Sequence, residues 1–226
     1  MTASIRVYLE VADKRAFASA IDWPGWSRSG RTIAAALDAL ASAGPRYAGA
    51  MGAIAAGLAT PVDGAGFDVA QEVRGGAGTD FGVPSRSPDG DDRPVGAAEL
   101  ERLTGILRAA LAAFDAAAIA AEGRALSTGP RGGGRSLAKM IGHVHESDWA
   151  YLGEIGGSYR SAAGVSEVVK RDAVRAAIVV ALAARVRGDP VPPSKRVRPF
   201  WTPRYLVRRS AWHALDHAWE LEDRLS

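Results

Sequence analysis

Two histidines stand four residues apart near the end of the chain, in the stretch "RRSAWHALDHAWELEDRLS". They are His213 and His217, and the residues around them have the apolar spacing of a helix. Side chains at helix positions i and i+4 project from one face about one turn apart, so two ring nitrogens can bind one metal ion. A lone pair with this spacing is a weak signal, and two satisfied or exposed histidines explain it equally well.

The other two of the four histidines lie in a second helical stretch, "KMIGHVHESDWAYLGEI". His143 and His145 both flank its apolar stripe, and only one of them can readily face a site. Asp148 falls inside the stripe, where a carboxylate is costly unless it is paired or bound to a metal. We therefore take Asp148 as a candidate catalytic residue or metal ligand, with a hydrogen bond from a Tyr or Arg side chain as the alternative.

The elements that must position these residues are all helices. From about residue 97 onward, apolar residues recur at helical spacing in four stretches, separated by segments rich in Gly, Ser and Pro. The sequence predicts helices at roughly 97–122, 135–156, 165–187 and 203–224. Four amphipathic helices of this length are the components of a four-helix bundle.

The first part of the chain has a different pattern. In residues 4–22, two runs of alternating apolar residues lie on either side of a polar "ADKR" turn, and this pattern predicts a β-hairpin. A helix is predicted from Thr32 to a stop at Gly44-Pro45, then a weaker helix in "RYAGAMGAIAAGL" and a strand or hairpin in "GFDVAQEVRGGAGTDFGVP". The fold class expected is therefore α+β, with a small α/β module at 1–83, a linker at 84–96 rich in Pro, Asp, Gly and Ser, and a bundle at 97–226.

The composition of the chain excludes some classes of function. The chain has no cysteine among its 226 residues, which excludes a disulfide, a thiolate nucleophile and a Cys-ligated metal in this chain. The net charge is +3 with basic residues scattered among acidic ones, so nucleic acid is not an expected partner, although "KRVRPFWTPRYLVRR" mixes arginines with aromatic residues. The first residues have no secretory signal pattern and no long uncharged apolar run is present, which favours a cytoplasmic protein without a membrane span.

The two histidine stretches together resemble a known family. "GHVHESDWAYL" with "WHALDHAWELEDR" is similar to the DinB superfamily over about residues 97–226. The resemblance implies a four-helix bundle that binds one divalent metal through His143, His213 and His217. In this alignment His143 takes the position on the second helix, and His145 has no counterpart.

A site of this kind has a defined chemistry. Three neutral imidazoles suit nickel, zinc or iron and leave at least one position for water or substrate. A bound metal would lower the pKa of a coordinated water or of an incoming thiol. Some members of the superfamily use low-molecular-weight thiols, so the resemblance implies a metal-dependent transferase, isomerase or hydrolase acting on a small-molecule substrate.

Three further residues are candidates for supporting roles. Glu220, on the row of His217, is a candidate base or a group that orients this ligand, with a solvated surface carboxylate as the alternative. Arg131 and Arg135 precede the second bundle helix, where backbone N–H groups favour anions. An anionic group of a substrate or cofactor could bind there, unless "TGPRGGGRS" is only a flexible turn.

The N-terminal stretch "FASAIDWPGWSRSGRTIAAALDAL" resembles the HicB-type fold over about residues 4–45. In toxin–antitoxin systems such a domain sequesters a small RNase, so the resemblance implies a second hypothesis. In that hypothesis the protein is a non-enzymatic, antitoxin-like binder of a partner, and the bundle is a scaffold. We favour instead a module that covers the mouth of the bundle. Trp23 and Trp26 are candidates for a hydrophobic lid, with structural packing of the turn as the default interpretation. A homodimer is compatible with either hypothesis.

Overall fold

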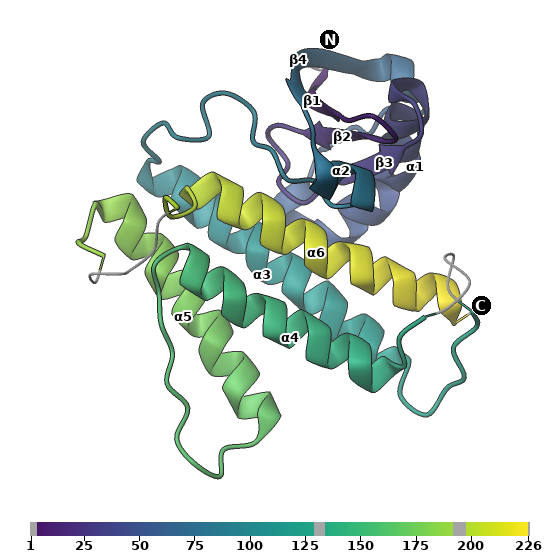
Figure 1. Cartoon of the computed structure of the whole chain (residues 1–226). Helices are drawn as coiled ribbons and strands as arrows, with labels where there is room; N and C mark the ends of the chain where they lie inside the picture. Colours follow the sequence, from purple (N-terminus) through teal and green to yellow (C-terminus); the bar gives the residue numbers. More distant parts are fainter. Residues whose placement is uncertain (1–3, 129–133, 192–197, 226) are drawn as a thin grey trace.

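The computed structural model describes residues 4–128, 134–191 and 198–225 and shows an α+β protein (Figure 1). A small sheet with one helix on it lies against a group of four long helices. The strands are β1 (Ile5–Val11), β2 (Ala16–Ala20), β3 (Ser27–Gly30) and β4 (Phe67–Arg74). The helices are α1 (Ile33–Met51), α2 (Ala77–Phe81), α3 (Ala97–Ala120), α4 (Leu137–Glu154), α5 (Glu167–Arg187) and α6 (Pro203–Arg224), with short 3-10 turns at Gly52–Ala55 and Gly64–Gly66.

The strand order in the sheet is β3-β2-β1-β4. β1 and β2 form the antiparallel hairpin predicted for residues 4–22, and β3 pairs antiparallel with β2. β4 pairs parallel with β1, which requires a crossover, and α1 supplies it. The stretch that follows β4 forms the short helix α2 and not a second strand.

Both faces of β1 are buried, although its alternation of apolar and polar residues is typical of a strand with one exposed face. Leu9 and Ala18 lie opposite each other on the face that packs on α1, while Glu10 and Phe17 are paired on the other face. On that second face, Phe17 makes an edge contact with Trp212 of α6 at 6.2 Å between ring centroids. The sheet is therefore packed between α1 and α6.

The buried carboxylate of Glu10 organises the chain that leaves the sheet. Glu10 is fully buried, and its oxygens accept hydrogen bonds from the Thr79 hydroxyl at 2.5 Å and from the backbone N–H groups of Ser85 at 2.9 Å and Arg86 at 3.1 Å. Burying a carboxylate is costly unless several donors satisfy it. Glu10 thus holds residues 79–86 against β1 and directs them towards α6.

The predicted helix stop at Gly44-Pro45 is wrong, because α1 continues without interruption to Met51. A Cβ on Gly44 would lie 2.7 Å from Cβ of Thr60, so this glycine is needed for close packing and not to end the helix. The weaker helix predicted in "RYAGAMGAIAAGL" is the last part of α1 followed by a 3-10 turn. Tertiary packing outweighs the local cost of Pro45 within the helix.

The four predicted bundle helices are present, with each end no more than two residues from the one expected. Helices α3 and α6 run parallel, since Arg204 at the start of α6 pairs with Glu99 at the start of α3 at 2.6 Å. Helix α4 runs the other way, because the Trp201 N–H just before α6 donates to the carbonyl of Glu154, the last residue of α4, at 2.8 Å. By length and hydropathy alone, α3 is the one helix in the described part of the chain that could span a membrane.

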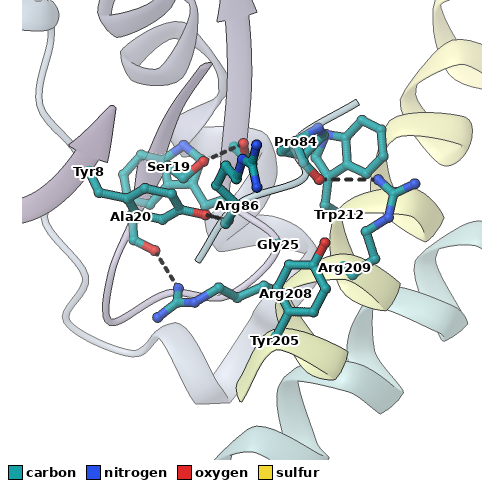
Figure 2. Close-up of a pocket in the computed structure, with 12 residues that line it drawn as sticks. Tyr8, Ser19, Ala20, Gly25, Pro84, Arg86, Tyr205, Arg208, Arg209 and Trp212 are labelled. Atoms are coloured by element: carbon teal, nitrogen blue, oxygen red, sulfur yellow. Dashed lines mark hydrogen bonds between the residues drawn. The ribbon is translucent and has the colours of Figure 1, made fainter. Parts of the chain in front are cut away.

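Residues 84–96, predicted as a linker, contact both halves of the protein. Asp91 is 5% exposed and accepts two hydrogen bonds from the guanidinium of Arg208 on α6, at 2.8 and 2.9 Å. Arg208 also donates to the carbonyl of Ala20 at the end of β2, at 3.1 Å (Figure 2). This buried ion pair joins the sheet, the 84–96 segment and α6.

The turn between β2 and β3 belongs to the core, so Trp26 has the packing role that was the default interpretation and does not form a lid. Trp26 is fully buried, stacks on Tyr47 at 5.4 Å between ring centroids and donates to the carbonyl of Leu40 at 2.8 Å. Trp23 is only partly buried and lies under the guanidinium of Arg102 on α3, 4.5 Å from the ring centroid. A Cβ on Gly25 would lie 2.8 Å from that of Ala211, so the turn packs directly on α6.

We expect Asp91→Asn to lower the free energy of unfolding by about 3 kcal/mol, because it leaves the buried guanidinium of Arg208 without its countercharge. Asp92→Asn is the matched control, since Asp92 is exposed, and should change stability by less than about 0.5 kcal/mol. Urea denaturation of the two variants measures both values. Equal free energies of unfolding for the two variants would show that the ion pair between Asp91 and Arg208 does not stabilise the fold.

Candidate metal centre

Three histidines from two helices converge on one point. The Nε2 atoms of His143 on α4 and His213 on α6 are 3.1 Å apart, and the ring of His217 lies 4.7 Å from that of His213. One nitrogen of each ring lies within 4.8 Å of the others, so the three could hold one metal ion. Among the described residues this is the one group of His, Asp or Glu side chains with that geometry.

The histidines of α6 are buried, and the histidine of α4 is the most exposed of the three. His213 and His217 are 6% and 7% exposed, whereas His143 is only partly buried. From the sequence, His213 and His217 are expected at the edge of the buried face; they are nearly as buried as the core itself. A ligand could therefore approach the group from the side of His143.

His145 points away from this group. Its neighbours are the charged residues Arg175 and Arg171 of α5, whose charges act on its pKa after the larger effect of burial. Its Nε2 atom is buried without a hydrogen-bond partner among the described residues. His143, and not His145, faces His213 and His217, which is the register predicted by the alignment.

Burial favours the neutral imidazole at His213 and His143. Desolvation, with smaller effects from the charges of His217 and Arg209, lowers the pKa of His213 to about 2. Desolvation and the charge of Arg135 also lower the pKa of His143 below its ordinary value. Metal ions bind neutral imidazole, so protons compete little for these two rings near neutral pH.

Glu220 lies behind the site and holds His217 in position. Its Oε2 atom is 3.2 Å from Nδ1 of His217, and its Oε1 atom accepts a bond of 3.4 Å from Arg224. The hydrogen bond with His217 is the main reason why the pKa of Glu220 is lowered. A carboxylate on Nδ1 leaves Nε2 free to bind a metal and fixes the ring orientation. This geometry supports the orienting role of Glu220 over that of a solvated surface carboxylate.

Asp148 is not part of the histidine group. It is 3% exposed and accepts a hydrogen bond of 2.9 Å from Nε of Arg175, whose Nη1 atom binds Asp115 at 2.7 Å. Asp148 therefore has the alternative role, in which its carboxylate accepts a hydrogen bond from an Arg side chain. Burial, only partly offset by Arg175, raises the pKa of Asp148 to about 6.

Arg135 lies at the start of α4, close enough to act on the site. Its side chain is exposed, and its charge affects the pKa values of His143, His213 and Glu220. Its carbonyl accepts a hydrogen bond of 3.0 Å from Arg224. An anion held by Arg135 would therefore lie near the histidines. Arg131, the other candidate, lies outside the described residues.

Arg209 and Tyr151 also adjoin the site, and neither was a candidate from the sequence. Tyr151 makes an edge contact with His213 at 5.8 Å between ring centroids. The guanidinium of Arg209 lies 5.8 Å from the Tyr151 ring and 4.9 Å from the Trp212 ring, beside the carbonyl of Pro84 (Figure 2). The available signal was the spacing of Arg209, four residues before His213, within the sequence stretch that mixes arginines with aromatic residues.

Comparison of the chain with protein-family models, with curated proteins and with solved structures finds no match. The similarities to the DinB superfamily and to the HicB-type fold therefore rest on the motifs quoted above. The function has to be argued from the site itself.

Asp148 should make the stability of the protein fall as the pH rises from about 4 to 6. Its pKa of about 6 in the folded protein exceeds the ordinary value of 3.8, so in this range the folded state holds a proton that the unfolded state has lost. The difference is about two pH units, or roughly 3 kcal/mol. The stability advantage of wild type over Asp148→Asn should therefore shrink by about this amount, measured by urea denaturation across the range.

The control for this experiment is Asp172→Asn, which changes an exposed carboxylate on α5. Its pKa is lowered, chiefly by the hydrogen bond from Arg171, so this substitution cannot remove a fall in stability with rising pH. A pH dependence that is the same in wild type and in Asp148→Asn would contradict the raised pKa.

Proposed function

We propose that the protein is a divalent-metal-binding, DinB-like protein whose three-histidine centre belongs to an enzyme of small-molecule metabolism in the cytoplasm. The observation that carries the proposal is the convergence of His143, His213 and His217 at one partly open point. The lowered pKa of His213 and the carboxylate of Glu220 on His217 support it. These are features of a metal centre rather than of three chance neighbours.

The three ligand atoms restrict which metals and which reactions suit the site. Three imidazole nitrogens without sulfur suit zinc, nickel or iron(II), and a site with three protein ligands retains a position for water or substrate. A metal bound there would supply an activated water or thiolate near neutral pH. His143, His213 and His217 would hold the metal, Glu220 would orient His217, and the exposed Arg135 would attract an anionic group.

The nucleophile has to come from outside the chain if it is a thiol, because the sequence has no cysteine. A low-molecular-weight thiol used as a cosubstrate agrees with the resemblance to DinB-like transferases and isomerases. Activated water would make the protein a hydrolase instead. The open side beside His143 is the approach for either nucleophile.

A non-enzymatic function is the second candidate, and β4 favours it. This strand lies at one edge of the sheet, and most of its side chains are exposed. An exposed edge can accept a strand from another protein, as expected of an antitoxin-like partner binder or of a homodimer. Binding of a protein partner through β4 would leave the histidine group free and would not require metal.

The proposal predicts that the full chain, purified without a histidine tag, takes up one zinc, nickel or iron(II) ion per molecule. His143→Ala should weaken binding by about 100-fold or more, since loss of a ligand costs at least as much as loss of a group that orients one. His145→Ala, two residues away on the same helix, should leave binding unchanged. Elemental analysis and competition with a chelator measure both values.

Two outcomes would count against the proposal. Failure of the wild-type protein to take up any of the three metals removes its main support and favours the partner-binding candidate. Equal losses in His143→Ala and His145→Ala would place the metal elsewhere or would show that the helix itself is perturbed.

A further inference from the structure

We propose that Arg209 binds a carboxylate group of the small molecule that occupies the open side of the three-histidine site. This inference rests on the proposed function and names the substrate class of the same site. It adds to Arg135 a second and better-defined anion-binding residue.

The position of Arg209 follows from the geometry of α6. Arg209, His213 and His217 are spaced four residues apart, so they form one row along the helix. Four residues correspond to about 6 Å along the helix axis, which is the length of a small organic acid. Tyr151 of α4 contacts both Arg209 and His213, which places these two side chains on the same side of α6 as α4.

Arg209 differs from the other arginines of α6. Arg204 pairs with Glu99, Arg208 with Asp91 and Arg224 with Glu220. Among the described residues Arg209 has no carboxylate partner. Its guanidinium donates a long hydrogen bond of 3.5 Å to the carbonyl of Pro84 and also forms a hydrogen bond with the Tyr151 side chain, and both of these partners are uncharged groups. A partly buried guanidinium without a countercharge has donors available for an anion.

The guanidinium of Arg209 is held in place without being neutralised. It lies against the rings of Tyr151 and Trp212, which restrict its side chain while leaving its charge intact. A held, planar guanidinium binds a carboxylate in a bidentate manner with little loss of side-chain entropy.

The electrostatic balance of the site also favours an anion. The three histidines are neutral ligands, so a divalent metal would keep its two positive charges. Arg209 and Arg135 add to this positive potential, and among the described residues Glu220 is the carboxylate that contacts the group. An acid whose second group reaches the metal would satisfy both the metal and Arg209.

The test uses the full chain loaded with cobalt(II), which reports thiolate binding by a charge-transfer absorption. The probes are two matched pairs, 3-mercaptopropionate with 3-mercapto-1-propanol and 6-mercaptohexanoate with 6-mercapto-1-hexanol. Within each pair only the carboxylate differs, and the two lengths cover different distances from the metal. We expect wild type to bind at least one acid about tenfold or more tightly than its matched alcohol, as for a hydrogen bond between charged groups.

Substitutions show which residue causes the preference for the acid over the alcohol. Arg209→Gln should abolish it without changing the affinity for the alcohol, and Arg209→Lys should retain part of it because the charge remains. Arg108→Gln removes an exposed arginine of α3 and should retain the full preference. The alcohol titration also shows whether each variant still holds cobalt at a folded site.

The outcomes separate this inference from the proposed function. A wild-type protein that takes up no cobalt overturns the proposed function and the inference with it. A cobalt site that binds each acid and its alcohol equally overturns the inference alone. A preference that survives Arg209→Gln and disappears in Arg135→Gln would likewise overturn it and assign the anion to Arg135.

Discussion

Helix α6 is buried along two faces at once, and the remaining features of the structure depend on this constraint. One face carries Arg208 and Trp212 and packs on the sheet, while the adjacent row carries His213 and His217 and faces α4. A helix in this position has little contact with water, so each polar side chain on it needs a partner. The ion pair between Arg208 and Asp91 meets this need on the first face, and Glu220 meets it at His217.

The same burial determines the chemistry of the site. Rings removed from water remain neutral, and neutral imidazoles are metal ligands rather than proton carriers. The sheet supports α6 from behind, since Phe17 contacts Trp212 and Gly25 packs on Ala211. The N-terminal module therefore supports the helix that carries the histidines, and the segment that follows the module reaches the same row of α6 at Pro84, which contacts Arg209, and at Ser85, which contacts Tyr205.

Local features were predictable from the sequence, and long-range features were not. The bundle helices have strong periodicity, so their ends were predicted to within two residues, and the i, i+4 spacing placed His213 and His217 on one row. The hydrogen bonds to Glu10 include a donor 69 residues away, and the partner of Arg208 is 117 residues away. No local sequence pattern indicates either of these contacts. Gly44 indicated a helix end by local rules, yet its contact with Thr60 decided the outcome. Arg209 was missed because only the missing carboxylate partner distinguishes it from its neighbours on α6.

The most direct test of the metal centre is an anomalous difference map from crystals of the zinc- or nickel-loaded protein, recorded at the absorption edge of the metal. We expect one strong peak between the rings of His143, His213 and His217, with Nδ1 of His217 still bonded to Glu220. A peak at another site, or three histidine rings without a peak in protein that carries the metal, would contradict the assignment of these residues as ligands.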